Sequence, residues 1–240
     1  MKRGQGKRQK QWNKIAILQD TVRSCTNCHL RDNTEKGPTP PHGTPYAKVL
    51  VLGEGPGLTE DRKRTPFVGK AGVALSEMLA EARFDKDHVA FGNTVSCRPP
   101  KNRTPFQTEA EACSHNVELT FRVFAPIVVV AVGSAAAQWF RQDIKITRDR
   151  GRAFHYPEWH RLVMPTLHPA FVLRNPSARE KVVQDFVDVR KYIEKGDELI
   201  PDTCRHCRQY VDYYDPYGFA YCHEHTPARE YRPTMQKSML

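Results

Sequence analysis

The chain has 240 residues, 39% of them hydrophobic, and a formal net charge of +10, a composition typical of a globular protein with one sizeable core. It lacks a run approaching the roughly 20 apolar residues of a membrane span, and its basic start lacks the apolar core of a secretory signal. These features exclude membrane and secreted proteins, favour a cytoplasmic location and make a polyanion such as nucleic acid the expected partner.

Residues 1–20 are predicted to form a basic arm. Lysines and arginines occur at six positions before residue 15, with no acidic residue among them. A basic arm on a basic chain indicates a nucleic-acid partner, although a solvated tail that keeps a protein soluble has the same composition. The arm alone does not distinguish these two interpretations.

The seven cysteines fall into two sets, which indicates two metal centres. Grouped cysteines in a cytosolic protein more often bind metal than form disulfides. The first set consists of Cys25, Cys28, Cys97 and Cys113. Four thiolates suit either a [4Fe–4S] cluster or a tetrahedral zinc ion, and their spacing does not separate the two.

The second set lies in residues 199–240, a polar, tyrosine-rich segment predicted to form a separate small module. Its Cys-x-x-Cys and Cys-x-x-His pairs are spaced as in a zinc knuckle or ribbon. A bound Zn²⁺ would stabilise a segment too small to fold by burial alone. This module is a candidate contact for DNA or a protein partner. The expected zinc ligands are Cys204, Cys207, Cys222 and His225, with His223 and His206 as alternatives to His225.

Strand-like and helix-like segments alternate along residues 21–198. The predicted strands are 48–53, 88–97, 126–133 and 161–169, and the predicted helices are 69–83, 108–123, 134–142 and 178–195. Apolar strands that alternate with helices predict an α/β fold, a three-layer α/β/α domain with a short central parallel sheet. Residues 145–160 are predicted to form a small hairpin with Gly151 near its turn.

Polar loops follow three of the predicted strands, at the edge where ligands bind in open α/β sheets. The first loop contains Gly53, Gly55 and Gly57, but it does not match the G-x-G-x-x-G of a dinucleotide site. Its acidic residues, Glu54 among them, would repel a pyrophosphate. The loop therefore favours a carboxylate held for chemistry over a phosphate cradle, although a turn with incidental acidic residues remains the alternative.

Four segments, in order, resemble the iron–sulfur uracil-DNA glycosylases, family 4 of the uracil-DNA glycosylase superfamily. They read CTNCHL, GEGPGLTEDRKRTPFVGKAG, NTVSCRPPKNRTP, and ITRDRG followed by MPTLHPAFVLRNP. The match runs from about residue 22 to about residue 194. Two positions depart from the family, which usually has alanine at Gly55 and glycine at Arg64. The compact third segment lacks the long insertion of a relative that traps its product covalently, so the hydrolytic form is the better match.

The resemblance implies an enzyme that flips uracil out of DNA and excises it. It implies that Phe67 stacks on the base and that the Asn93 amide reads the uracil edge. It also implies that His168 donates to O2 of the base and that Glu54 orients the attacking water. Without the family match, Phe67 would be read as a core residue and Asn93 as a turn or cap residue.

The resemblance adds further binding residues. Gly53 and Gly55 belong to the uracil-binding loop. Glu60 is placed near C5 of the base, where it would help exclude thymine, with capping of the following helix as the alternative. The residues implied to contact DNA in the minor groove are Leu173, Arg174 and Asn175.

The resemblance favours a structural [4Fe–4S] cluster at the first cysteine set. It places no lysine as a Schiff-base nucleophile, so we expect a monomeric, monofunctional glycosylase that leaves an abasic site in single- or double-stranded DNA. The alternatives are a catalytically inactive DNA-binding accessory protein on the same fold and a zinc-bound nucleic-acid adaptor.

Overall fold

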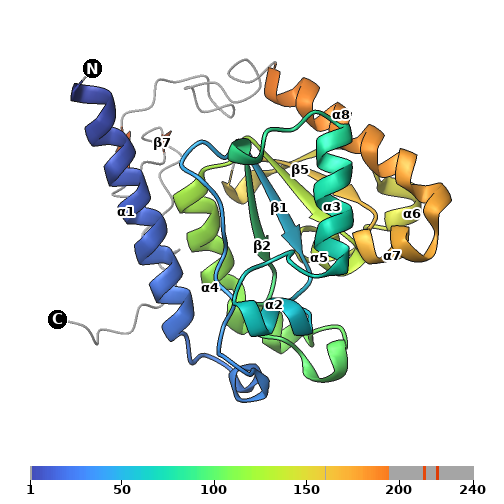
Figure 1. Ribbon diagram of the computed structural model, residues 1–240, viewed down its shortest axis with the longest axis horizontal. Helices are drawn as coiled ribbons and strands as arrows, with labels where there is room; N and C mark the ends of the chain where they lie inside the picture. The colour runs from blue at the N-terminus through green and yellow to red at the C-terminus, as the bar shows by residue number, and fades with distance from the viewer. Residues whose placement is uncertain (1, 160, 195–212, 215–219, 222–240) are drawn as a thin grey trace. The chain divides into compact units, whose positions relative to one another are not determined.

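The computed structural model describes residues 2–159, 161–194, 213–214 and 220–221 (Figure 1). The chain divides into two units, residues 1–196 and 197–240. In the second unit, β6 (Tyr213–Tyr214) and β7 (Ala220–Tyr221) pair antiparallel. The predicted zinc ligands lie outside the described residues, so the zinc module stays a prediction.

The first unit is organised around a five-stranded sheet with the order β2-β1-β3-β5-β4 in the described part of the chain. Four strands run parallel: β1 (Val49–Gly53), β2 (Val89–Asn93), β3 (Val128–Val132) and β5 (Arg161–Thr166). Every residue of β1 and β3 is buried, as expected for parallel strands covered on both faces. The α/β fold with a parallel sheet is thereby confirmed. The register brings the carboxyl ends of these strands to one edge.

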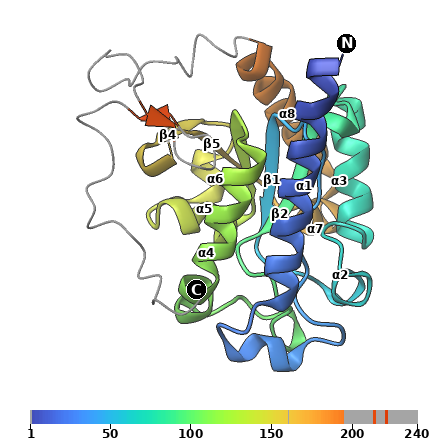
Figure 2. The ribbon, with the colours of Figure 1, turned by 90° about the vertical axis from the view of Figure 1, so that its left-hand side faces the viewer.

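Helices cover both faces of the sheet (Figures 1 and 2). On one face the helices that contribute buried residues are α3 (Lys70–Glu81), α7 (Pro169–Arg174) and α8 (Arg179–Glu194). On the other face they are α1 (Lys2–Ser24), α4 (Gln107–Phe124) and α5 (Ser134–Phe140). The remaining short helices and turns are η1 (His29–Asn33), α2 (Leu58–Lys63), η2 (Lys86–His88), η3 (Pro100–Asn102), α6 (Ile146–Asp149), η4 (Pro157–Trp159) and η5 (Pro176–Ala178).

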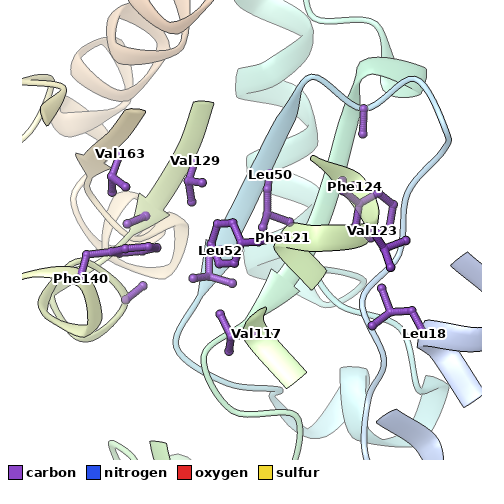
Figure 3. Packing of buried hydrophobic residues seen from close by; sticks show 14 of the residues in the cluster. Leu18, Leu50, Leu52, Val117, Phe121, Val123, Phe124, Val129, Phe140 and Val163 are labelled. Carbon is purple, nitrogen blue, oxygen red and sulfur yellow. The ribbon is translucent and has the colours of Figure 1, made fainter. Parts of the chain in front are cut away.

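The alternation of side chains along each strand builds the two cores. Leu50 and Leu52 point to the α4 side, where they pack with Phe121 in the cluster that Figure 3 shows. Val49 and Val51 point to the opposite side and pack with residues of α3 and α8. The central strands β1 and β3 are therefore covered on both faces. No helix in the described part of the chain is long and apolar enough to cross a membrane.

The predicted basic arm lies within α1, which continues past residue 20 to Ser24. Ile15, Leu18 and Val22 recur at helical spacing and are at most 2% exposed. They join the core cluster on the α4 face of the sheet. The second half of the predicted arm is therefore part of the folded unit.

The prediction of a hairpin with Gly151 near its turn was wrong. Residues 146–149 form the short helix α6, because Asp149 accepts a hydrogen bond from the Lys145 N–H at 2.8 Å and closes the helical turn. The strand that follows, β4 (Phe154–Tyr156), pairs antiparallel with β5, so the hairpin turn comes after Tyr156. Gly151 precedes this hairpin and has a positive φ of 72°.

Candidate active site

The loops that follow β1 and β2 are joined by hydrogen bonds. The Thr94 N–H donates to the Gly53 carbonyl at 2.8 Å, and the Val95 N–H donates to the Glu54 carbonyl at 3.1 Å. The Thr94 hydroxyl also donates to the Glu54 carbonyl, at 2.7 Å. The backbone carbonyl of Glu54 thus accepts two hydrogen bonds, which fix the backbone that carries this half-buried side chain. Next to it, a Cβ at Gly55 would lie 2.9 Å from Val95 Cγ2.

Gly53 brings Phe67 and Asn93 together. It ends β1 beside Asn93, its register partner on β2. A Cβ at position 53 would lie 2.6 Å from the Asn93 Oδ1 and 2.8 Å from the Phe67 Cζ. The aromatic ring and the amide therefore meet over the same glycine. The Phe67 ring also packs against Phe91, with a centroid distance of 5.7 Å.

The backbone of Phe67 adopts a conformation that needs support from its neighbours. Its φ is 53°, in the left-handed region that non-glycine residues rarely occupy. Gly72 on α3 lets the chain pass at close range, because a Cβ there would lie 1.9 Å from the Phe67 carbonyl oxygen. Strain of this kind persists only where the surrounding structure imposes it.

Glu60 contributes to the same loop. Its Oε1 accepts a hydrogen bond from the Gly69 N–H at 2.7 Å, and Gly69 is the N-cap residue of α3. This contact supports the helix-capping alternative for Glu60. Because Gly69 follows Phe67 by two residues, the carboxylate also holds the segment that carries the aromatic ring.

His168 is the N-cap residue of α7, and its Nδ1 accepts a hydrogen bond from the Ala170 N–H at 3.1 Å. This bond leaves the proton of the neutral imidazole on Nε2. Burial lowers the pKa of His168 below its usual value of 6.5, and the positive charge of Arg174 lowers it further, against an opposing effect of Glu60. His168 is therefore a neutral Nε2–H donor.

Gly133 and a buried ionic network hold the His168 loop in place. A Cβ at Gly133, whose φ is 95°, would lie 3.1 Å from the His168 Cβ. Two residues before the histidine, the Thr166 hydroxyl donates to Asp185 Oδ2 at 2.5 Å. Arg150 pairs with the other oxygen of Asp185 at 2.6 Å. The ITRDRG motif thus reaches the site through Asp185, a role that its position in the sequence does not reveal.

The predicted DNA contacts lie just after the histidine, at the end of α7. Leu173, Arg174 and Asn175 are all exposed. Leu173 is 50% exposed and Phe171 is 40% exposed, so two large apolar side chains lie on the surface of α7. Phe171 was not predicted, although an aromatic residue two positions before Leu173 is a signal of an extended apolar contact.

The four cysteines of the first set line one cavity. All four are free thiols. Burial raises the pKa of Cys97 to about 12, and the other three thiols add to this effect. Among the described residues, no group of three or more His, Cys, Asp or Glu side chains is placed so that it could hold a metal ion. Four thiols suit an iron–sulfur cluster or a zinc ion, so the metal at this cysteine set stays a prediction.

Glu109 connects the segments that carry these cysteines, and the sequence reasoning missed it. It is 1% exposed and pairs with Arg103 at 2.6 Å and with His29 Nε2 at 2.9 Å. It also accepts a hydrogen bond from the Phe106 N–H at 2.7 Å. His29 follows Cys28 directly, Arg103 lies between Cys97 and Cys113, and Glu109 lies one helical turn before Cys113. The sequence signal for this role was an acidic residue in the first turn of a predicted helix that follows a Pro-rich loop, a position where a carboxylate often caps the helix.

The charge of Glu109 is favoured by these partners. The hydrogen bonds from Arg103 lower the pKa of Glu109 to about 2, although burial acts in the opposite direction. A buried carboxylate with a bidentate arginine, a histidine and a backbone N–H is fully satisfied. The cysteine loops are therefore joined by a stable ionic centre as well as by the cavity they share.

Comparison with known proteins agrees with this geometry. Residues 40–192 match the family model described as the uracil DNA glycosylase superfamily. The type-4 uracil-DNA glycosylase of Thermotoga maritima is 36% identical over 190 residues, which cover 75% of this chain and 95% of that protein. That of Archaeoglobus fulgidus is 36% identical over 195 residues, 77% of this chain and 98% of the relative. The type-4 enzyme of Sulfurisphaera tokodaii is 34% identical over 185 residues, which cover 72% of this chain and 82% of that protein.

These relatives confirm the resemblance that four sequence motifs predicted. The matched region contains the sheet and the loops at its carboxyl edge, with Glu54, Phe67, Asn93 and His168. The chain belongs to the uracil-DNA glycosylase superfamily, with type-4 enzymes among its relatives.

Proposed function

We propose that this protein is a monofunctional uracil-DNA glycosylase, which hydrolyses the N-glycosidic bond of uracil in DNA and leaves an abasic site for base excision repair. One observation carries the proposal. The ring of Phe67 and the amide of Asn93 meet over Gly53, at the carboxyl edge of the sheet. The glycine lets the ring and the amide approach each other, and we assign the pair to a planar base that would stack on the ring and hydrogen-bond to the amide.

Base recognition follows from this arrangement. Phe67 stacks on the flipped base, which gives affinity for any base. The Asn93 amide donates to O4 and accepts from N3–H of uracil. Cytosine offers a donor in place of O4 and an acceptor in place of N3–H, so it leaves both groups of the amide unmatched. Selectivity against cytosine therefore resides in Asn93.

Departure of the base is assisted by His168. As the C1′–N1 bond breaks, negative charge develops on uracil and is shared by O2. The neutral imidazole donates its Nε2–H to that oxygen, a contact that strengthens in the transition state. The histidine keeps its proton, and uracil leaves as an anion.

Glu54 positions the water molecule. We assign its carboxylate to orient a water molecule that attacks C1′ and to take the proton released when the new C–O bond forms. Its negative charge also favours the oxocarbenium-like sugar. None of the residues assigned to the reaction is a lysine, so no Schiff base forms and the DNA backbone stays intact.

Other residues position this centre. We propose that Cys25, Cys28, Cys97 and Cys113 hold a structural [4Fe–4S] cluster, which when bound would cross-link the loops around Asn93. We propose that Glu60 acts mainly by holding the Phe67 loop. The residues assigned to the DNA minor groove are Leu173, Arg174 and Asn175, which would fill the space left by the flipped nucleotide and contact the backbone.

A gel assay tests the proposal. Protein with intact iron is incubated with an oligonucleotide that contains one uracil, and the product is treated with alkali. Wild type and Ile17→Ala, a variant of an exposed residue remote from these loops, should both give alkali-dependent cleavage. Glu54→Ala and His168→Ala should each lower the rate by about 100-fold or more. Binding of the DNA by wild type without loss of uracil would instead identify an accessory protein without catalysis.

A further inference from the structure

A groove beside α1 lies outside the uracil-binding residues. It has a volume of about 320 Å³, and its walls come from α1, from the loop over residues 40–43 and from the segment after α2. The side chains that matter here are Trp12, Gln19, Arg23, His42, Arg64 and Thr65. The family motifs do not include most of these positions.

The α1 wall is one continuous face of the helix. Trp12, Gln19 and Arg23 recur at intervals of seven and four residues, which places them on one side. Gln19 Nε2 donates to the Pro41 carbonyl at 3.1 Å and so ties this face to the loop. Trp12 is 45% exposed. An exposed tryptophan in a groove presents a flat surface for stacking.

The charge of the groove favours an anion. It is lined by two arginines and a histidine, and none of its lining residues is acidic. Burial and the nearby charges of Arg23 and Arg31 lower the pKa of Arg64. Arg23 pairs with Asp20 at 2.8 Å, but both side chains are exposed and such a pair is weak. The two arginines therefore give the groove a net positive charge.

Arg64 stands where a helix would ordinarily place glycine. It is the left-handed C-cap residue of α2, with a φ of 51°. Its Nε and Nη2 donate to the Pro38 carbonyl at 3.3 Å, which holds the side chain against the segment that precedes the loop over residues 40–43.

The groove leads to the base-binding residues. Thr65 lines the groove and precedes Phe67 by two residues. His42 exchanges backbone hydrogen bonds with Phe91 at 2.9 and 2.7 Å, and the Phe91 ring packs on Phe67. From Trp12 to Arg23 the helix rises roughly 16 Å, about five steps of a stacked strand at roughly 3.4 Å each.

We propose that this groove binds an unpaired segment of the DNA strand that continues from the flipped uracil. Trp12 stacks on a base of that segment, and Arg23 and Arg64 contact its phosphates. The segment must be unpaired because a base inside a duplex has no free face for Trp12. The inference rests on the proposed function, and it adds a preference for single-stranded over duplex DNA.

Fluorescence anisotropy of the full chain with labelled DNA tests the groove. The probe is an oligonucleotide without uracil, used as a single strand and as a duplex of the same sequence. Trp12→Ala should weaken single-strand binding at least fivefold and duplex binding less than twofold. Arg64→Gly should also weaken single-strand binding and reduce the slope of log K against log salt by about 0.7.

Two matched controls accompany these variants. Ile17→Ala removes a 66% exposed apolar side chain from α1 outside the groove. Arg83→Gly removes an exposed arginine that, like Arg64, has a left-handed backbone, with a φ of 61°. Both should bind within twofold of wild type. Single-strand DNA should also quench tryptophan emission in wild type but not in Trp12→Phe, since the other two tryptophans stack on each other at 5.3 Å.

Wild-type single-strand affinity in Trp12→Ala and Arg64→Gly would overturn the proposal, and so would an equal loss on single strand and duplex. Because the binding probe contains no uracil, its result is independent of excision. If wild type excises uracil while the groove variants bind normally, only the groove assignment fails. If the groove variants lose binding while wild type leaves uracil in place, the proposed reaction fails and the groove stands.

Discussion

Gly72 lies directly against the backbone of Phe67: a Cβ at position 72 would lie 1.9 Å from the Phe67 carbonyl oxygen and 2.6 Å from its Cα. The contact joins the first turn of α3 to the residue proposed to stack on uracil. It leaves the left-handed backbone of Phe67 little room to move. The position of the Phe67 ring therefore depends on the lack of a side chain at position 72.

Gly72→Ala should displace Phe67 and lower uracil excision by an order of magnitude or more, because the backbone rather than a flexible side chain must give way. Overpacking of this kind also costs about 1–3 kcal/mol of stability. Excision rate and thermal unfolding, measured side by side, check both effects. Gly92→Ala is the matched control, since its Cβ would lie 3.6 Å from Leu52 Cδ1, an ordinary contact. Wild-type excision by Gly72→Ala would contradict the argument.

Arg174→Ala should raise the pKa of His168. Burial still holds that pKa below 6.5, but removal of a nearby positive charge makes the imidazolium easier to form. The proposed donor is the neutral imidazole, so protonation of His168 should lower the excision rate at acidic pH. In Arg174→Ala this loss of rate should therefore begin at a higher pH than in wild type. A histidine NMR titration beside a pH–rate profile measures the shift. Arg174→Lys keeps the charge and should leave the titration near wild type, whereas equal shifts in both variants would exclude a charge effect.

Glu109 should contribute to stability against acid. Its pKa falls from an unfolded value of 4.5 to about 2 in the folded protein, so its contribution is present above about pH 4.5 and is lost as the pH falls toward 2. This difference corresponds to on the order of 3 kcal/mol. Glu109→Gln should be less stable at neutral pH and lose less stability than wild type between these pH values. Urea unfolding at several pH values measures this.

The exposed neighbour Glu111 offers the control for Glu109. Glu111→Gln changes the same charge on the same helix and should unfold like wild type. Iron content measured at neutral pH gives a second readout, because Glu109 joins segments that carry Cys28, Cys97 and Cys113. Full iron occupancy and unchanged acid unfolding in Glu109→Gln would show that the ionic centre is dispensable.

Gly55→Ala should be destabilising in this chain, although the resemblance drawn from the sequence implies alanine at this position. The new Cβ would lie 2.9 Å from Cγ2 of Val95, a side chain that is 1% exposed and has little room to move. The double variant with Val95→Ala should recover much of the loss in melting temperature. Additive losses in the double variant would show that Val95 is not the obstacle.

Much of the fold could be predicted because the sheet is buried on both faces. The run PIVVVAVG could be read as a strand, and it contains β3, whose residues are all buried. The strand predicted over 88–97 ends earlier, at Asn93, because Thr94 and Val95 turn to donate hydrogen bonds to the loop after β1. That exchange joins two loops far apart in sequence, so local periodicity could not reveal it.

Motifs in the sequence could name the residues proposed for the site, but they could not name the residues that support them. Phe67, Asn93 and His168 could be assigned from motifs. The contacts of Gly72 and Glu109 could not, because each depends on segments that only the folded chain brings together. The basic composition of α1 likewise concealed the apolar stripe that anchors its second half in the core.

The cavity shared by the four cysteines has a consequence for chain connectivity. Its first and last cysteines, Cys25 and Cys113, enclose the stretch of sequence that holds Glu54, Phe67 and Asn93. A cluster in this cavity would tie that stretch into a closed loop, while the sheet beneath keeps its own hydrophobic core. Oxidative loss of iron would then weaken uracil binding before the protein unfolds. The iron supply and the oxidant load of the cell would set how much uracil this protein can remove.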